Sequence, residues 1–160
     1  MRYTVHPSPL GDLLLAGPRP GVLASVTVPG QRGGASVQPD WVRDDAALSE
    51  VAEQFDAYFA GDLKEFALTL EPAGTPFRQR VWDALDEIPF GATTTYGALA
   101  ARLGLPRSAA RAVGGAVGAN PLTVIRPCHR VLGANGSLTG YAGGLDRKRL
   151  LLTHEGVALA

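Results

Sequence analysis

The 160-residue sequence contains one cysteine, Cys128, which excludes an internal disulfide and a sulfur-rich zinc site. It has no apolar run near the roughly 18 to 20 residues that a membrane-spanning helix requires, and no basic and apolar leader at its start. We therefore expect a cytoplasmic protein in a reducing compartment, with no membrane partner and no bound metal.

Acidic residues are missing from one long stretch. The chain as a whole has 15 basic and 15 acidic side chains, but residues 1–76 carry five basic and ten acidic ones, and residues 77–160 carry ten and five. No Asp or Glu occurs between Glu87 and Asp146, where five arginines do. The second half is therefore a candidate cationic, nucleic-acid-binding surface. These arginines are Arg102, Arg107, Arg111, Arg126 and Arg130.

The first half alternates short apolar runs with Pro/Gly turns, which predicts a small antiparallel sheet. The expected strands span residues 2–6, 13–16, 22–28 and 66–70. Apolar residues at helical spacing predict a helix over residues 45–60 that covers this sheet. The linker 71–74 coincides with the change of charge sign, so we place the domain boundary there, between lobes 1–74 and 75–160.

The second half is predicted to be helical. Thr75 followed by Pro76 is a typical helix start, and Thr95 can cap a second helix that ends near Leu103. After a four-residue turn at 104–107, Ser108 can cap a third helix through Gly118. Two short helices joined by a glycine-containing turn indicate a helix-turn-helix. The fold class is therefore α+β, with a small N-terminal α/β lobe and a C-terminal helical lobe.

The third helix contains Gly114, Gly115 and Gly118, although each interior glycine costs about 1 kcal/mol of helix stability. Bare positions allow either tight packing against a neighbouring helix or close approach of an external backbone. Arg111 is the one long cation on this helix. It favours the second interpretation.

Cys128 lies in the run Pro127-Cys128-His129-Arg130-Val131. His129 is a candidate base, and the arginines at 126 and 130 would favour a thiolate. Neighbouring residues of an extended chain point to opposite sides, so a turn or a bridging water must connect Cys128 to His129. Glu155, in a final helix over 147–155 ended by Gly156, is the candidate carboxylate that orients His129.

These motifs resemble the O6-alkylguanine-DNA alkyltransferase family. The resemblance covers residues 75–157 and reaches the N-terminal lobe only in general character. It rests on the cysteine run and on segments in the same order and spacing: 88–91, Tyr96, 111–116, Asn120-Pro121, 141–145 and 154–156.

The resemblance implies single-turnover transfer of an alkyl group from O6-alkylguanine in duplex DNA to Cys128, by a monomer without a cofactor. It implies that His129, held by Glu155, activates Cys128 through water. Tyr96 would donate to the departing guanine, and Asn120 would organise the turn that bears the cysteine.

The resemblance also implies DNA contacts from the minor-groove side, with Arg111 filling the space that the flipped base leaves. The expected DNA-binding residues are Thr95, Ser108, Arg111, Ala112, Gly114, Gly115 and Arg130. The expected substrate pocket comprises Pro127, Val131, Tyr141 and Gly143.

Three positions depart from the pattern of the family. Ala142 lacks the hydroxyl that relatives often have, which bears on alkyl-group preference, and Gly118 replaces a second basic residue of some relatives. Arg126 replaces the common apolar residue before the Pro-Cys pair. Three other functions stay open: a non-catalytic damage-binding protein, a thiol hydrolase, and a transcriptional regulator.

Overall fold

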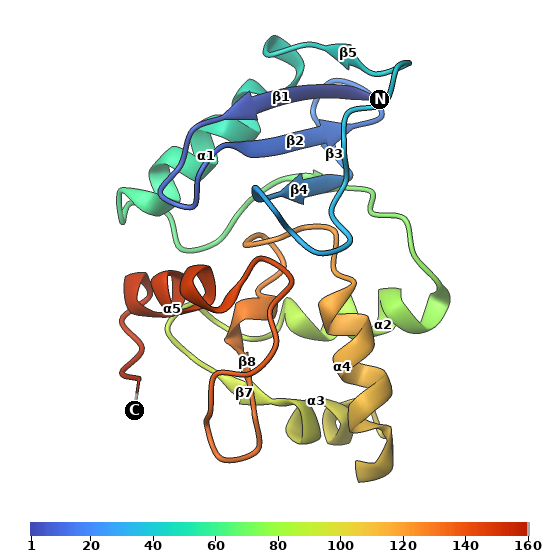
Figure 1. The fold of residues 1–160 in the computed structure, drawn as a ribbon, viewed down its shortest axis with the longest axis vertical. Helices are drawn as coiled ribbons and strands as arrows, with labels where there is room; N and C mark the ends of the chain where they lie inside the picture. Colours follow the sequence, from blue (N-terminus) through green and yellow to red (C-terminus); the bar gives the residue numbers. More distant parts are fainter. Residues whose placement is uncertain (160) are drawn as a thin grey trace. The chain divides into compact units, whose positions relative to one another are not determined.

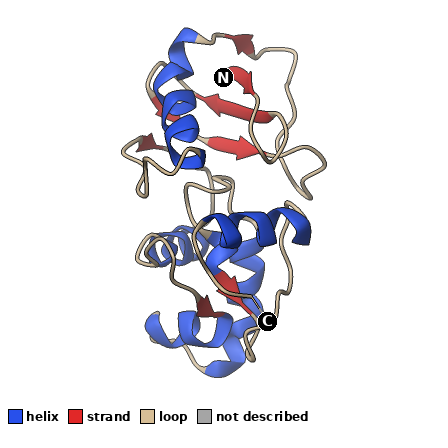
Figure 2. Ribbon diagram, turned by 90° about the vertical axis from the view of Figure 1, so that its left-hand side faces the viewer, coloured by secondary structure: helices blue, strands red, loops and turns tan. Residues whose placement is uncertain are grey.

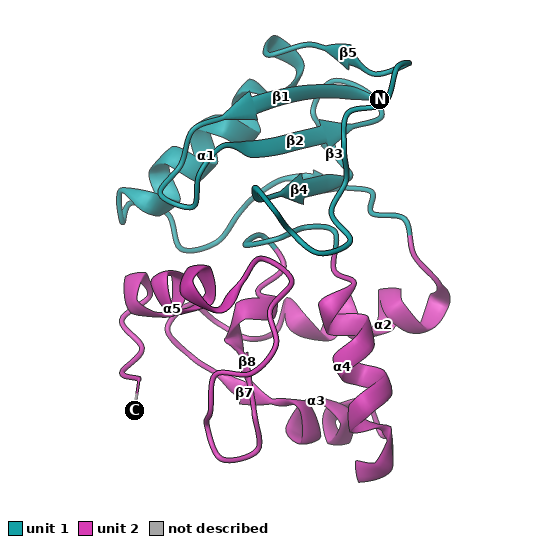
Figure 3. Ribbon diagram, viewed as in Figure 1, with its two compact units in different colours: residues 1–73, 121–125 teal, residues 74–120, 126–160 magenta. Residues whose placement is uncertain are grey.

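The computed structural model describes residues 1–159, which form two compact units. Unit 1 contains residues 1–73 and 121–125, and unit 2 contains residues 74–120 and the chain from 126 onward (Figure 3). Segment 121–125 therefore groups with the first unit, although the sequence placed it in a continuous second lobe. The boundary between residues 74 and 75 stays a prediction about independent domains.

Unit 1 is built on a four-stranded sheet in the order β4-β2-β1-β5 (Figure 1). Its strands are β1 (Arg2–His6), β2 (Leu13–Gly17), β4 (Ser25–Thr27) and β5 (Val42–Arg43). β2 pairs antiparallel with both β1 and β4. β5 adds to β1 in parallel, at an edge where no strand was predicted. Both side chains of β5 are exposed, and so gave no apolar alternation to detect.

The predicted strand 22–28 divides between two sheets. β3 (Val22–Leu23) pairs in parallel with β6 (Thr69–Leu70), which is shorter than the predicted strand 66–70. Between β3 and β4, the amide of Ala24 donates to the carbonyl of Ala16. The chain thus joins the main sheet two residues after β3 begins.

The predicted covering helix is present as a short 3₁₀ turn, η1 (Ala46–Leu48), followed by α1 (Ser49–Phe59). Val51, Phe55 and Tyr58 are its buried side chains. Figures 1 and 2 show α1 lying against the strands of unit 1. This confirms the interpretation of its apolar stripe as the cover of the sheet.

Segment 121–125 joins unit 1 through main-chain contacts. The amide of Val26 donates to the carbonyl of Pro121 at 2.8 Å, and Val26 forms a parallel bridge with Leu122. Val124 has a φ of 75°, which is strained for a β-branched residue. This strained residue lies four positions before the cysteine.

The described part of unit 2 contains four α-helices: α2 (Pro76–Leu85), α3 (Tyr96–Arg102), α4 (Ala110–Gly118) and α5 (Leu145–His154). The Thr75 hydroxyl accepts from the amide of Arg78, and that of Thr95 accepts from the amide of Ala98. Both predicted caps are therefore confirmed. The indole of buried Trp82 donates to the carbonyl of Ala116 at 2.8 Å and links α2 to α4.

The connection between α3 and α4 is longer than the predicted turn, because it contains a 3₁₀ turn, η2 (Arg107–Ala109). Ser108 lies inside η2 and makes no capping hydrogen bond, and Ala109 precedes α4. The prediction that Ser108 caps the helix is wrong. The helix pair itself is present, with α3 packed against α4.

Two short strands, absent from the predictions, connect the helix pair to the cysteine region. β7 (Thr94–Thr95) pairs in parallel with β8 (Val131–Leu132), directly after the 3₁₀ turn η3 (Cys128–Arg130). Two-residue strands carry no recognisable period. Within residues 1–159, no helix has the length and apolar character needed to cross a membrane.

Candidate active site

Cys128 begins η3, directly after Pro127. The carbonyl of Arg126 accepts two hydrogen bonds, from the amide of Cys128 at 2.7 Å and from Nδ2 of Asn120 at 2.9 Å. Asn120 is itself buried. The cysteine therefore lies on a short turn whose approach is held by the buried Asn120 side chain.

The Cys128 side chain is enclosed, because the residue is only 8% exposed. Burial raises the pKa of the Cys128 thiol, and hydrogen bonding by Asn120 and Tyr141 and the charge of Lys148 oppose this shift without reversing it. We expected flanking arginines to favour a thiolate at rest. The structure instead indicates a resting thiol that must lose its proton during a reaction.

His129 is fully buried, and its Nε2 lies 2.8 Å from Oε2 of Glu155. Since an ionised carboxylate only accepts hydrogen bonds, Nε2 carries the proton and Nδ1 has a free lone pair. Nδ1 is buried and has no hydrogen-bond partner among the described residues. Burial lowers the pKa of His129, against the raising effect of Glu155. The resting imidazole is therefore neutral and can accept a proton at Nδ1.

Arg130, expected to bind DNA, is buried. Its Nε lies 2.7 Å from Oε1 of Glu155 and its Nη2 lies 2.9 Å from Oε2, while Nη1 donates to the carbonyl of Ile88 at 2.5 Å. A guanidinium with these internal partners cannot reach a phosphate. The assignment of Arg130 to the DNA surface is corrected.

Lys148 is a site residue that the sequence analysis missed. It is fully buried on α5, and its Nζ donates to the carbonyls of Val131, Thr139 and Gly140 at 2.6, 2.9 and 3.2 Å. Burial lowers the pKa of Lys148 to about 8. Its position was detectable, because residues 148, 151 and 152 of α5 and residue 155 after it are buried at helical spacing.

Tyr96 begins α3, and its hydroxyl donates to the carbonyl of Thr139 at 3.4 Å. Burial raises the pKa of Tyr96, and the charge of Cys128 adds to this effect. The phenol thus stays protonated at neutral pH and can act as a donor. Tyr96, Cys128 and the loop at 139–140 are therefore grouped at one site.

The other predicted pocket residues adjoin this group. Pro127 and Val131 are buried on either side of η3, and Tyr141 is half-buried. Gly143 is buried, and its carbonyl accepts from Nη1 of Arg147 at 2.9 Å. Their contact with a substrate stays a prediction.

The glycines of α4 have no packing explanation. An added Cβ at Gly115 or Gly118 would meet nothing within 4 Å, and one at Gly114 would meet only the Tyr96 ring, at 3.6 Å. Tight packing against a neighbouring helix would leave no such space. The bare face, with exposed Arg111 and Ala112, is therefore open to an external molecule.

The cationic surface is smaller than the sequence suggested. Arg126 and Arg130 are buried, and Arg102 pairs with Glu87 at 3.1 Å. Arg107 and Arg111 are exposed and form no ion pair within residues 1–159. Ser108 is exposed beside them, whereas the Thr95 hydroxyl is engaged in its cap.

Arg126 is a buried cation whose guanidinium has few hydrogen-bond partners. Its side chain is 9% exposed. Nη2 lies 3.5 Å from Oδ1 of Asp83 and Nε lies 3.6 Å from Oδ1 of Asp86, both beyond normal hydrogen-bond length. Its Nε and Nη1 have no hydrogen-bond partner among the described residues. Residues 1–159 contain no group of three or more His, Cys, Asp and Glu side chains that could hold a metal.

Two family models match the chain. The DNA binding domain of 6-O-methylguanine DNA methyltransferase matches residues 76–157, and the ribonuclease-like domain of the same family matches residues 1–72. Together they span nearly all of the sequence. The resemblance found from the sequence motifs reached the N-terminal lobe only in general character. The second family model matches this lobe as well.

Curated relatives are similar over more than nine-tenths of their length. The methylated-DNA–protein-cysteine methyltransferase of Methanosarcina acetivorans is 48% identical over 98% of this chain and 99% of its own. The Mycobacterium tuberculosis protein of the same description is 48% identical over 97% of this chain and 92% of its own. The crystal structure of M. tuberculosis OGT in complex with DNA aligns with a TM-score of 0.90 and 46% identity, covering 100% of this chain and 96% of that one.

Proposed function

The chain belongs to the 6-O-methylguanine DNA methyltransferase family, and we propose that it repairs DNA by moving the alkyl group of O6-alkylguanine to Sγ of Cys128. The observation that carries this assignment is the arrangement around the only cysteine. A buried thiol adjoins a neutral His129 whose Nε2 is held by Glu155 and whose Nδ1 is free. The site thus pairs a nucleophile with a base ready to accept its proton.

The proton of Cys128 passes to Nδ1 of His129 through a water molecule. Successive residues of a 3₁₀ turn point about 120° apart, which disfavours a direct contact between these neighbours. The resulting imidazolium is stabilised by Glu155, and the thiolate attacks the saturated carbon attached to O6. No oxyanion hole is required, because no tetrahedral intermediate forms at this carbon.

The carbon–oxygen bond breaks as the sulfur–carbon bond forms, and both electrons of the broken bond leave with guanine. Tyr96, kept protonated by its surroundings, donates a proton to the departing base. The proton that Cys128 lost replaces the one that Tyr96 gave, so His129 and Tyr96 both return to their starting states. The products are guanine and S-alkylcysteine.

The product at Cys128 is a thioether, which has no acyl carbon for water to attack. Nothing in this chemistry restores the thiol. Each chain therefore reacts once.

Access to the lesion requires extrusion of the base, because a buried cysteine cannot reach into a stacked duplex. We assign this task to α4. Its open glycine face allows the DNA backbone to approach from the minor groove, and exposed Arg111 enters the gap left by the flipped base. Arg107 and Ser108 lie beside it for phosphate contacts.

The alternatives from the sequence are less well supported. A thiol hydrolase uses a preformed thiolate–imidazolium pair, whereas burial here favours a neutral thiol and a neutral imidazole. A non-catalytic damage-binding protein would not need Cys128. A transcriptional regulator would leave the buried Cys128, His129 and Glu155 cluster without a purpose.

The test measures how much of the lesion remains in the DNA. A duplex with one O6-methylguanine is incubated with an excess of protein, and the lesion is quantified by nucleoside analysis. Wild type is expected to convert it to guanine, and Cys128→Ala to bind the duplex without converting it. Full conversion by Cys128→Ala would refute the assignment.

A further inference from the structure

We propose that Arg130 is a positioning residue that holds His129 in its neutral state by neutralising Glu155. The inference rests on the proposed function, in which neutral His129 accepts the proton of Cys128. It also gives a role to a residue that we expected on the DNA surface.

The guanidinium of Arg130 is fixed on several sides. Nε and Nη2 bind the two oxygens of Glu155, and Nη1 binds the carbonyl of Ile88. Cζ lies 6.0 Å from the centre of the Phe90 ring, a cation–π distance. Glu155 is likewise fixed, because it follows α5 immediately and Gly156, at a φ of 81°, turns the chain away. Two residues far apart in sequence thus form one rigid pair.

His129 and Arg130 donate to the same oxygen of Glu155. Oε2 of Glu155 lies 2.9 Å from Nη2 of Arg130 and 2.8 Å from Nε2 of His129. Arg130 is always charged and already balances the single negative charge of the carboxylate. A protonated His129 would add an uncompensated positive charge at a site with no exposed surface, which is unfavourable. A neutral His129 keeps the group balanced and still donates from Nε2.

The cations near His129 lower its pKa, and its partner Glu155 raises it. Burial is the main cause of the lowered pKa of His129, and the charges of Arg130 and of Lys148, which lies on α5, lower it further. His154, next to Glu155 in sequence, packs edge-on against Phe90 at 6.2 Å. Arg130 binds both oxygens of Glu155, the carboxylate partner of His129.

This arrangement has a consequence for the order of proton transfers. If Arg130 were absent, Glu155 would be free to stabilise an imidazolium at rest, and Nδ1 would carry a proton. The base would then be blocked until a higher pH removed that proton. With Arg130 present, Nδ1 is available, and the positive charge on His129 appears only when Cys128 becomes negative, so the pair stays balanced.

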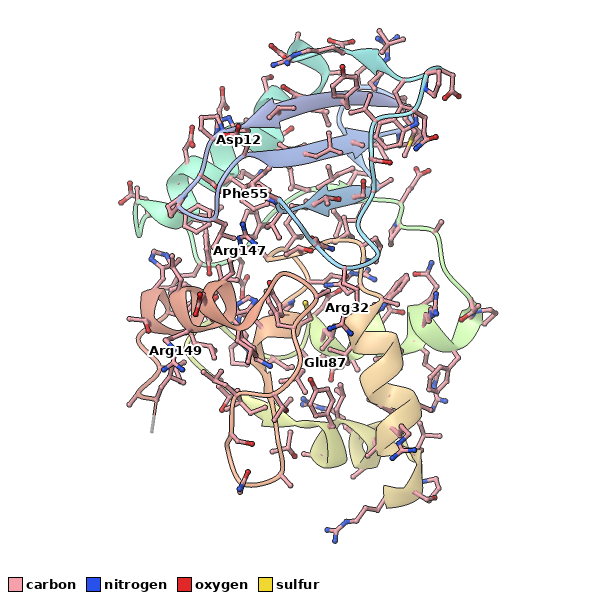
Figure 4. The ribbon with its side chains drawn as sticks, viewed as in Figure 1. Asp12, Arg32, Phe55, Glu87, Arg147 and Arg149 are labelled. Carbon is pink, nitrogen blue, oxygen red and sulfur yellow. The ribbon has the colours of Figure 1, made fainter. Side chains whose placement is uncertain are left out.

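The experiment titrates His129 by NMR of its imidazole nitrogens in the full chain, and measures the rate of transfer from free O6-methylguanine against pH. The free base removes DNA binding from the measurement. Arg130→Gln is compared with Arg130→Lys, which restores the charge. Arg149→Gln is the matched control, because Arg149 is exposed on α5 and extends outward in Figure 4.

We expect wild-type His129 to be neutral at pH 7, with its proton on Nε2. Arg130→Gln should move both the His129 midpoint and the acid limb of the rate profile up by about one pH unit or more, a tenfold change in proton affinity. Arg130→Lys, which keeps the positive charge, should bring both values most of the way back to those of wild type. Arg149→Gln should shift neither value.

An unmoved His129 midpoint in Arg130→Gln, or a rate that falls equally at every pH, would overturn the proposal. Should Arg130→Gln not fold, the wild-type spectrum decides: an imidazolium at pH 7 refutes it, and the neutral Nε2–H form supports it. The proposed function fails separately, if wild type transfers no alkyl group while the NMR titrations behave as described.

Discussion

Nε2 of His129 lies 2.8 Å from Oε2 of Glu155, and neither side chain has exposed surface. The same carboxylate binds Arg130 through both of its oxygens. Glu155 therefore has two roles. It orients His129 for the reaction, and its ion pair with Arg130 stabilises unit 2 by connecting η3 to the end of α5.

Glu155→Gln should weaken the fold as well as slow transfer. Gln leaves the buried Arg130 without a counter-charge, and removal of one partner of a buried ion pair typically costs about 3 to 5 kcal/mol. The free energy of unfolding in urea is the measurement. Glu87→Gln is the control, because its ion pair with Arg102 is exposed and should contribute less than about 1 kcal/mol. Equal small losses in both variants would contradict the structural role of Glu155.

Lys148 should make stability rise with pH in an unusual window. Burial lowers its pKa from 10.5 to about 8, so between these values the unfolded chain binds a proton that the folded chain does not. Stability from this group therefore increases from pH 8 to 10.5, by about 1.4 kcal/mol per pH unit. The free energy of unfolding of wild type relative to Lys148→Met should grow over this range by at most about 3 kcal/mol, because any solvent near the ammonium reduces the effect. A difference that is flat with pH would show that Lys148 keeps its ordinary pKa.

Arg126→Leu should stabilise the protein. The variant removes a buried cation with long ion pairs and two nitrogens without hydrogen-bond partners, and replaces it with an apolar side chain. We expect a gain of about 1 to 3 kcal/mol in the free energy of unfolding. Arg78→Leu, at an exposed position of α2, should change it by no more than about 0.5 kcal/mol. A loss of stability in Arg126→Leu would mean that the pairs with Asp83 and Asp86 are net favourable.

Arg111→Ala separates extrusion from chemistry. Since exposed Arg111 touches none of the reacting groups, the variant should react with free O6-methylguanine at the wild-type rate and repair a lesion in duplex DNA at least tenfold more slowly. Saturating protein is used, so that a lost phosphate contact does not limit the rate. Equal loss on both substrates would place Arg111 in support of the pocket instead.

Local signals in the sequence were enough to predict much of unit 2. Thr75 and Thr95 cap their helices as expected, because capping depends on a few neighbouring residues. The pairing of Glu155 with His129 is a contact between distant residues, and it was predicted from a carboxylate at the unfavourable, C-terminal end of the last helix.

What failed depends on contacts distant in sequence. Arg130 is one position from His129, and nothing local distinguishes an arginine on a DNA surface from one that meets a carboxylate 25 residues later. β5, β7 and β8 are two residues long each, too short for any period. The lowered pKa of Lys148 arises from desolvation of its ammonium in the folded chain, which no linear pattern encodes.

Transfer to Cys128 is tested most directly by the intact mass of the protein after incubation with excess duplex DNA that contains O6-methylguanine. We expect a gain of one methyl group per chain, located on Cys128 by peptide mapping, after which the reaction stops. Continued turnover beyond one methyl per chain, or a methyl group on any other residue, would contradict this expectation.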